Sequence, residues 1–377
     1  MTMKRTVAFA AVTVIAFLLL SDLALRFFLS PLPSRPFEWP PPDMTKHGMM
    51  EDKALFWKLR PGYNDRWGLY KLAYTHELVG KKQIDWKARK RLAAPVYKGV
   101  TWEVNQDGFR GPSIPKEKLP RTSRLLFLGS SITFGWGVPA AEVFPEIVRK
   151  GLEKAFPKAP FETLNAGVPG YSSFQGMLYL ETILPRFKPD VVIAEFGIND
   201  GTVATGKQDK EWRPRFSDTV HQALRRSGWG RLVLRLFHPL IKKPGIVEKT
   251  QTWDQARKSF YRVSMTGALT RVAPDDFRAN LDKMAALCRK NGALFYVFIP
   301  SLYNEYGDKR LTPSVNFLTS YSIPIHKTLS SYPPEVLQTL FLPFDEGHLS
   351  KKGHNVVGKC MVDFLTPRIA ANSGQRK

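Results

Sequence analysis

The central part of the chain alternates between two hydrophobic patterns. Segments typical of buried strands occupy residues 124–129, 161–167, 189–197 and 293–301. The first of them is the continuous apolar run RLLFLG. Segments that repeat apolar positions at helical spacing occupy residues 140–156, 172–187, 275–292 and 350–367. Such alternation predicts βαβ units, and therefore an α/β sandwich in which helices cover a mostly parallel sheet.

The N-terminus carries an apolar segment of a different kind. Lys4 and Arg5 precede an uncharged run that ends at Leu20, and the apolar character resumes until Phe28. We interpret residues 1–30 as an uncleaved signal anchor that forms a transmembrane helix, with a cleaved signal peptide as the alternative. Because the positive charges lie before the apolar run, the rest of the chain is expected outside the cytoplasm.

The remaining sequence divides into three regions. Residues 31–45 are rich in proline and predict a stiff linker. Residues 46–120 are an irregular N-terminal extension with little strand, expected to pack on the main domain. The main domain is predicted over 121–370, with an insert at about 201–274 that interrupts the strand and helix pattern.

The insert is rich in Lys and Arg, and its segment 227–243 predicts a basic amphipathic helix. This helix either touches lipid or covers a functional site, or it packs on the domain with its arginines in water. The whole chain has a net charge of +23. No nucleic-acid motif accompanies that charge and it is scattered along the chain, so an anionic membrane surface is the better match than a nucleic acid.

The chain has two cysteines, Cys288 and Cys360, which excludes a disulfide scaffold. Cys288 lies on the apolar phase of a predicted helix, which favours a buried free thiol, although pairing with Cys360 stays open.

Three predicted strands end in polar or glycine-rich blocks. The blocks are GSSIT with Ser131, NAGVPG with Gly167 and Gly170, and GIND with Asn199. In a parallel sheet, ligands bind beyond the carboxyl ends of the strands. Taken alone, Ser131 is as readily a helix cap as a nucleophile, and the glycines as readily form a simple turn. An amide such as that of Asn199 can stabilise an oxyanion because it donates hydrogen bonds without competing for a proton.

A fourth block, DEGH, precedes the last predicted helix. Asp345 lies three residues before His348, a spacing that lets a carboxylate reach the Nδ1 atom of the imidazole and fix its tautomer. His354 lies further into the helix and is interpreted as structural. The spacing of His and Cys offers no zinc site, and no metal or organic cofactor is indicated.

Taken in order, these four blocks resemble the SGNH hydrolase superfamily, also called GDSL lipases and esterases. The resemblance implies a flavodoxin-like three-layer α/β/α fold and a serine hydrolase that cleaves an ester through an acyl-enzyme. Ser131, Asp345 and His348 would form the catalytic triad, and Ser131, Gly170 and Asn199 would form the oxyanion hole. One residue departs from the pattern: Ser130 stands where the family usually has Asp, which concerns the shape of the loop more than the chemistry.

The expected substrate is an ester-bearing small molecule, lipid or glycan. Two alternatives stay open from the sequence. An O-acyltransferase that modifies an exported polysaccharide or lipid would use the same residues, and a catalytically inactive SGNH-like domain would bind glycans.

Overall fold

The computed structural model describes residues 3–29, 48–65, 100–202, 204, 208–211, 224, 227–237, 269–300, 322–342 and 347–375. The predicted linker, most of the insert and Asp345 lie outside the described residues. The chain divides into two compact units: unit 1 comprises Met1–Glu38 and Trp212–Lys249, and unit 2 comprises Trp39–Glu211 and Thr250–Lys377.

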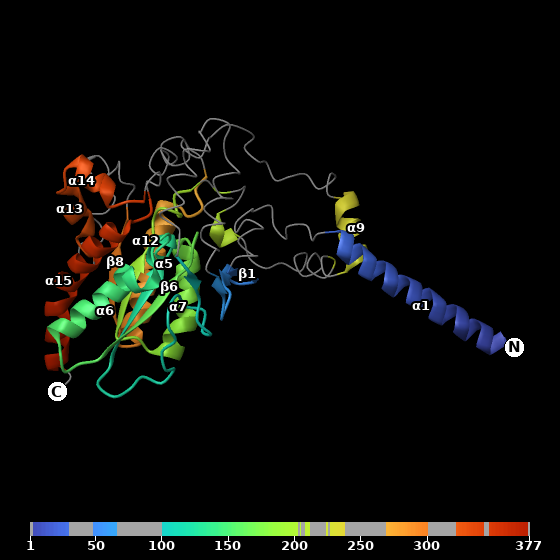
Figure 1. The fold of residues 1–377 in the computed structure, drawn as a ribbon, viewed down its shortest axis with the longest axis horizontal. Helices are drawn as coiled ribbons and strands as arrows, with labels where there is room; N and C mark the ends of the chain where they lie inside the picture. Colours follow the sequence, from blue (N-terminus) through green and yellow to red (C-terminus); the bar gives the residue numbers. More distant parts are fainter. Residues whose placement is uncertain are drawn as a thin grey trace. The chain divides into compact units, whose positions relative to one another are not determined.

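Unit 2 is built on a parallel sheet (Figure 1). Its four strands pair in the order β6-β5-β7-β8. The strands are β5 (Ser123–Gly129), β6 (Phe161–Gly167), β7 (Val191–Glu195) and β8 (Leu294–Phe298). They coincide with the four strands predicted from the sequence. Their register aligns the last residue of β5, Gly129, with Gly167 of β6 and Glu195 of β7. The segments that follow these three strands therefore leave the sheet at the same edge.

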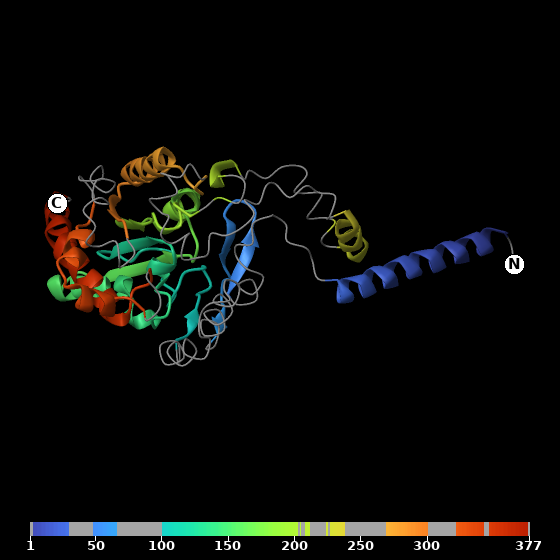
Figure 2. The ribbon, with the colours of Figure 1, turned by 90° about the horizontal axis from the view of Figure 1, so that it is seen from above.

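Helices cover both faces of the sheet (Figure 2). One layer contains α6 (Phe144–Ala155) and α15 (Lys351–Gln375), and the other contains α7 (Ser173–Phe187) and α12 (Pro274–Lys290). The core between the sheet and the first layer contains a large apolar cluster that includes Phe127, Ile193, Phe144, Val148 and Met361. The predicted α/β fold with a central parallel sheet is thus confirmed.

The N-terminal extension contains two small antiparallel pairs. The first joins β1 (Met49–Asp52) to β2 (Phe56–Leu59), and the second joins β3 (Asn64–Asp65) to β4 (Trp102–Glu103). The first pair contacts the turn after β6, because the indole N–H of Trp57 donates to the carbonyl of Pro169 at 3.0 Å and the hydroxyl of Tyr171 donates to the carbonyl of Trp57 at 2.6 Å.

Short helices complete unit 2 around the sheet. They are α5 (Ser131–Phe134), η1 (Ala140–Glu142), η2 (Asp209–Glu211), α13 (Ile325–Ser330) and α14 (Pro334–Thr339). Both cysteines are free: Cys288 is buried in α12 and Cys360 is half-buried in α15.

The described part of unit 1 contains α1 (Met3–Phe28) and α9 (Gly228–Phe237), which pack together although they lie about two hundred residues apart. The backbone N–H of Trp229 donates to the carboxylate of Asp22 at 3.1 Å, and its indole N–H donates to the hydroxyl of Ser21 at the same distance. Arg231 donates to the carbonyls of Arg26 and Leu29 at the end of α1. The predicted amphipathic helix therefore forms, and it packs on α1, a contact that the sequence did not indicate.

The transmembrane helix predicted over 1–30 is not supported. Among the helices that the structure describes, none combines the length and the apolar character needed to cross a bilayer.

The close approach of β6 to α5 yields a prediction about stability. A Cβ added to Gly167 would lie 2.1 Å from the backbone nitrogen of Phe134, and backbone yields less readily than a side chain. We expect Gly167→Ala to destabilise unit 2 by about 3 kcal/mol or more, at or above the usual cost of overpacking. Urea unfolding would measure it, and Thr163→Ala, at a half-buried position of the same strand, should cost less than about 1 kcal/mol. Equal midpoints for the wild type and Gly167→Ala would contradict the prediction.

Candidate active site

The turn between β5 and α5 places Ser131 at the carboxyl edge of the sheet. Ser130 is the N-cap of α5, and its hydroxyl accepts from the backbone N–H of Ile132 at 3.3 Å. A Cβ on Gly129 would lie 2.2 Å from the hydroxyl of Thr133 and 2.7 Å from the carboxylate of Glu195. A glycine is therefore required at the end of the strand, because the side chains of the turn and of β7 fold over it.

Ser131 and His348 meet although 217 positions separate them in the chain. The Nε2 atom of His348 lies 2.7 Å from the Oγ atom of Ser131, and both residues are half-buried. The imidazole also stacks on the indole of Trp136, with ring centroids 5.7 Å apart and an angle of 25° between the planes. This arrangement lets His348 accept the hydroxyl proton of Ser131. Asp345 lies outside the described residues.

The glycine block and the GIND block meet at the same edge of the sheet as Ser131. Gly170 has φ +81°, a left-handed conformation that favours glycine. The side-chain amide of Asn199 donates to the carbonyl of Tyr171 at 2.9 Å, which ties the end of β7 to the turn after β6 and leaves its second N–H. Among the hydrogen bonds of the described residues, none uses the backbone N–H of Ser131 or Gly170. These N–H groups and the amide are donors of the type that an oxyanion hole needs.

Comparison with known proteins decides the family. Residues 127–314, about half of the chain, match the GDSL-like Lipase/Acylhydrolase family, a range that includes Ser131, Gly170 and Asn199. The chain belongs to the GDSL-like lipase/acylhydrolase family. It is an ester hydrolase of the SGNH type. The matched range ends before His348, which the fold brings to Ser131.

Solved structures are similar at low sequence identity. The lipase/acylhydrolase of Enterococcus faecalis is 16% identical with a TM-score of 0.39, covering 65% of this chain and 96% of its own. A psychrotrophic esterase of Pseudoalteromonas sp. is 13% identical with a TM-score of 0.37, covering 66% and 99%. An acetyl xylan esterase is 15% identical with a TM-score of 0.41, covering 64% and 99%. No curated protein matches the chain.

In this GDSL-family hydrolase, a buried arginine holds the glycine turn. Arg271 donates to the carbonyl of Gly170 at 2.8 Å, to the side-chain oxygen of Gln175 at 2.7 Å and to both oxygens of Asp209. Asp209 also accepts from the hydroxyl of Ser172 at 2.6 Å. Because Arg271 and Asp209 are both buried, the pair neutralises its own charge while fixing the turn. No local sequence pattern marked either residue.

A second buried arginine holds the loop that carries Trp136. Arg110 donates to the carbonyls of Phe134, Gly135 and Val138, the last two at 2.5 Å. Burial lowers the pKa of Arg110 to about 9. The loop, and with it the indole that stacks on His348, is thus fixed from inside the protein.

His354, interpreted as structural from the sequence, and the neighbour of Asn199, Asp200, both have structural contacts. The Nδ1 atom of His354 accepts from the backbone N–H of Phe144 at 3.1 Å, and the ring stacks on that phenylalanine. Burial lowers the pKa of His354 to about 3, with the charges of Arg110 and His348 adding to the effect. Asp200 accepts from the backbone N–H groups of Ser173 and Gly197, and burial raises its pKa to about 6.

The sequence reading missed Glu195, which ends β7 beneath Ser131. It is buried, and burial raises its pKa to about 7 against the lowering effect of hydrogen bonds from Ser130 and Thr133. A charged residue within the apolar run VVIAEFG was the available signal, because an isolated carboxylate in a buried strand needs a specific partner.

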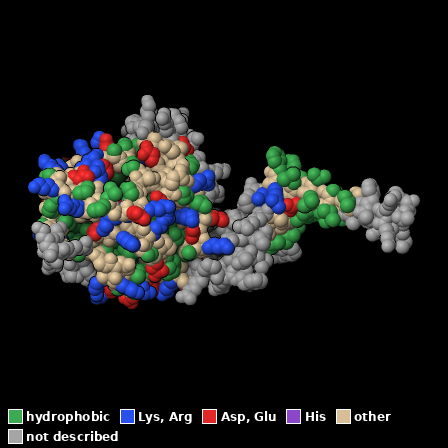
Figure 3. Space-filling view, turned by 90° about the horizontal axis from the view of Figure 1, so that it is seen from below, with side chains coloured by type: hydrophobic (Ala, Val, Ile, Leu, Met, Phe, Trp, Pro, Cys, Tyr) green, Lys and Arg blue, Asp and Glu red, His purple; other side chains and the backbone are tan. Residues whose placement is uncertain are grey.

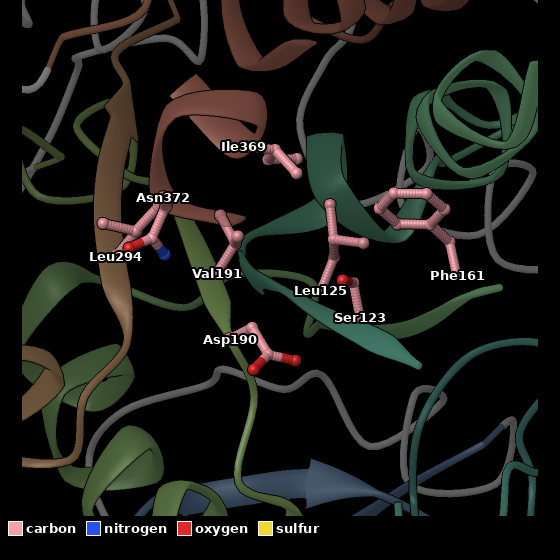
Figure 4. Close-up of a pocket in the computed structure, with 8 residues that line it drawn as sticks. All are labelled: Ser123, Leu125, Phe161, Asp190, Val191, Leu294, Ile369 and Asn372. Carbon is pink, nitrogen blue, oxygen red and sulfur yellow. The ribbon is translucent and has the colours of Figure 1, made fainter. Parts of the chain in front are cut away.

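A cavity elsewhere in unit 2 is separate from this site. It is lined by residues such as Ser123, Asp190, Leu294 and Asn372 (Figure 4). These positions lie at the amino-terminal end of the sheet, whereas Ser131 follows its carboxyl end.

The low pKa of His354 predicts how stability depends on pH. Its pKa falls from 6.5 to about 3 on folding, so the folded state binds fewer protons between these values and loses stability as the pH falls through them. Between pH 7 and pH 5 this contribution is roughly 2 kcal/mol. His354→Gln lacks the ionisation, so its unfolding free energy should fall by that much less over the same interval. Urea titrations at both pH values test this, and parallel losses in the two proteins would refute it.

Proposed function

We propose that Ser131 is the nucleophile of this ester hydrolase, that His348 is its general base and that Asp345 orients His348. The observation that carries the proposal is the 2.7 Å contact between the Oγ atom of Ser131 and the Nε2 atom of His348. A hydroxyl is a weak nucleophile at neutral pH, and a neutral imidazole at hydrogen-bond distance activates it.

The proposed reaction has two halves. As the Oγ atom of Ser131 bonds to the ester carbonyl carbon, its proton passes to His348, and the carbonyl oxygen becomes an oxyanion. The N–H groups of Ser131 and Gly170 and the amide of Asn199 donate to that oxyanion. His348 then protonates the leaving alcohol, and an acyl-enzyme remains. A water molecule that His348 deprotonates attacks the acyl carbon and releases the acid and the free serine.

Substitution of these residues should separate their roles. We expect Ser131→Ala and His348→Ala to lower kcat on p-nitrophenyl acetate by roughly 10⁴–10⁶-fold, because the two groups act as a unit. Asn199→Ala should lower it by about 10²–10³-fold, the effect of losing one oxyanion donor. Ser330→Ala, at an exposed serine of α13, serves as the control and should keep full activity. Retention of activity by Ser131→Ala would disprove the assigned nucleophile.

Direct assays can identify the acyl group that the enzyme removes and the acceptor that receives it. An O-acyltransferase would pass the acyl group to a sugar or lipid hydroxyl, so products are compared with and without an acceptor glycan. A series of p-nitrophenyl esters of increasing chain length, with acetylated xylan as a polymeric donor, defines the substrate class. A folded protein that a fluorophosphonate probe leaves unlabelled at Ser131 would instead be a binding domain.

We also propose that the protein works outside the cytoplasm, attached to an anionic membrane surface through unit 1. Support comes from the charge pattern around residues 1–30 and from the apolar side chains exposed on α1 (Figure 3). Leu19, Leu20 and Phe27 are among the exposed residues. Trp229 and Leu236 of α9 are exposed as well, and so is the cationic Arg235 of the same helix. Apolar side chains next to cations are the composition that binds lipid interfaces.

Vesicle flotation tests this attachment. The full chain should float with vesicles that contain anionic phosphatidylserine, and Leu19→Glu combined with Leu23→Glu should weaken binding on the order of tenfold or more, since two apolar contacts are lost. Leu119→Glu changes a leucine of unit 2 that is also exposed and should leave binding intact. Unchanged flotation of the α1 variant would exclude α1 as the lipid contact.

A further inference from the structure

Glu195 is the buried carboxylate beneath the nucleophile turn. Its side chain is 1% exposed and accepts four hydrogen bonds. The donors are the backbone N–H and hydroxyl of Ser130, both at 2.9 Å, and the backbone N–H and hydroxyl of Thr133, at 3.1 and 2.9 Å. All four belong to the two residues that lie on either side of Ser131 and Ile132, and no cation of the described chain forms a salt bridge with Glu195.

These bonds determine which backbone N–H group is available at the start of α5. The N–H groups of Ser130 and Thr133 donate to Glu195, and that of Ile132 donates to the hydroxyl of Ser130. The N–H of Phe134 donates to the carbonyl of Ser130. Within the described hydrogen bonds, the N–H of Ser131 is the one left without an acceptor. It is also the N–H that the proposed mechanism assigns to the oxyanion.

The geometry points to Glu195 as a positioning residue: by holding Ser130 and Thr133 from β7, its carboxylate fixes the turn so that the hydroxyl of Ser131 faces His348 and the N–H of Ser131 faces the oxyanion. This inference rests on the proposed function of Ser131. Glu195 touches neither substrate nor His348 and acts only through the turn.

Burying the Glu195 carboxylate costs folding free energy, and this cost makes the positioning role testable. A carboxylate in this buried position is harder to ionise than in the unfolded chain, and its pKa rises from 4.5 to about 7. The folded state therefore binds more protons between these values, so the stability contribution of Glu195 is greatest below pH 4.5 and falls as the pH rises to 7. All four donors meet one oxygen of Glu195, Oε2. The carbonyl oxygen of a neutral Gln can take that position and escapes the cost of burying a charge, but it accepts the four bonds without the negative charge and therefore holds the turn less strongly.

We therefore expect Glu195→Gln to separate stability from activity. At pH 8 its melting temperature should equal or exceed that of the wild type. Its kcat should fall about 10- to 100-fold, because small displacements of a reacting group have effects of that order, while KM should change less than about twofold, since substrate contacts are preserved. A purely structural role for Glu195 would lower the melting temperature and leave the kcat of the folded fraction unchanged.

Glu162→Gln is the matched control. Glu162 lies at the opposite end of the sheet, where it forms a salt bridge of 2.7 Å with the buried Arg124. Its substitution should lower the melting temperature and leave kcat and KM unchanged. The two glutamine variants should thus show opposite patterns.

A double-mutant cycle with Thr133→Val tests whether Glu195 acts through the turn. Valine keeps the shape of threonine but removes the hydroxyl that donates to Glu195. Thr133→Val should lower kcat in the wild type and have much less effect in Glu195→Gln, because the bond is already altered there. Additive effects on kcat, or a kcat of Glu195→Gln within twofold of the wild type, would overturn the inference.

The outcome for Ser131→Ala keeps the two proposals apart. If that variant is inactive while Glu195→Gln retains its turnover, only the role of Glu195 fails. If Ser131→Ala is itself active, the proposed function fails first.

Discussion

Gly129, Gly167 and Glu195 lie side by side in one row of the parallel sheet, and the position of the active site follows from that row. Because the three strands end level, the segments after them leave the sheet together and bring Ser131, Gly170 and Asn199 to one edge. The register also presses α5 against β6 so closely that Gly167 has no room for a side chain. A shift of one residue in either pairing would turn side chains to the opposite face and separate the groups.

Charged groups buried around this row fix the loops that surround it. Arg271 with Asp209 holds the glycine turn, Arg110 holds the loop of Trp136, and Glu195 holds the nucleophile turn. Burying a charge costs folding free energy unless hydrogen bonds compensate it. Each of these groups has several such bonds, and each group bonds to a backbone or hydroxyl group of one of the turns or loops around Ser131, Gly170 and Trp136. Hydrogen bonds are directional and apolar packing is not, so these buried polar contacts can fix the orientation of individual backbone groups in the loops.

The sequence predicted the parts of this arrangement that depend on local pattern. The four strands and the main helices follow from apolar periodicity, and the contact between Ser131 and His348 was expected from the resemblance of their blocks to those of the SGNH hydrolase superfamily. The sequence could not indicate Arg271, Asp209 or Arg110, because their hydrogen-bond partners lie far from them in the chain. It likewise did not predict the packing of α9 on α1, which joins two segments that no periodicity relates.

Ser130 stands where the SGNH pattern usually has Asp, and the position of Glu195 gives a physical explanation for this difference. The turn needs an acceptor beneath it for the N–H groups of Ser130 and Thr133, and here that acceptor reaches them from β7. A second carboxylate at position 130 would lie beside the first without a cation, and like charges at that distance in a buried site repel strongly. Ser130 instead donates to Glu195 and accepts from Ile132. Serine at 130 and glutamate at 195 are therefore complementary, and neither residue is explained without the other.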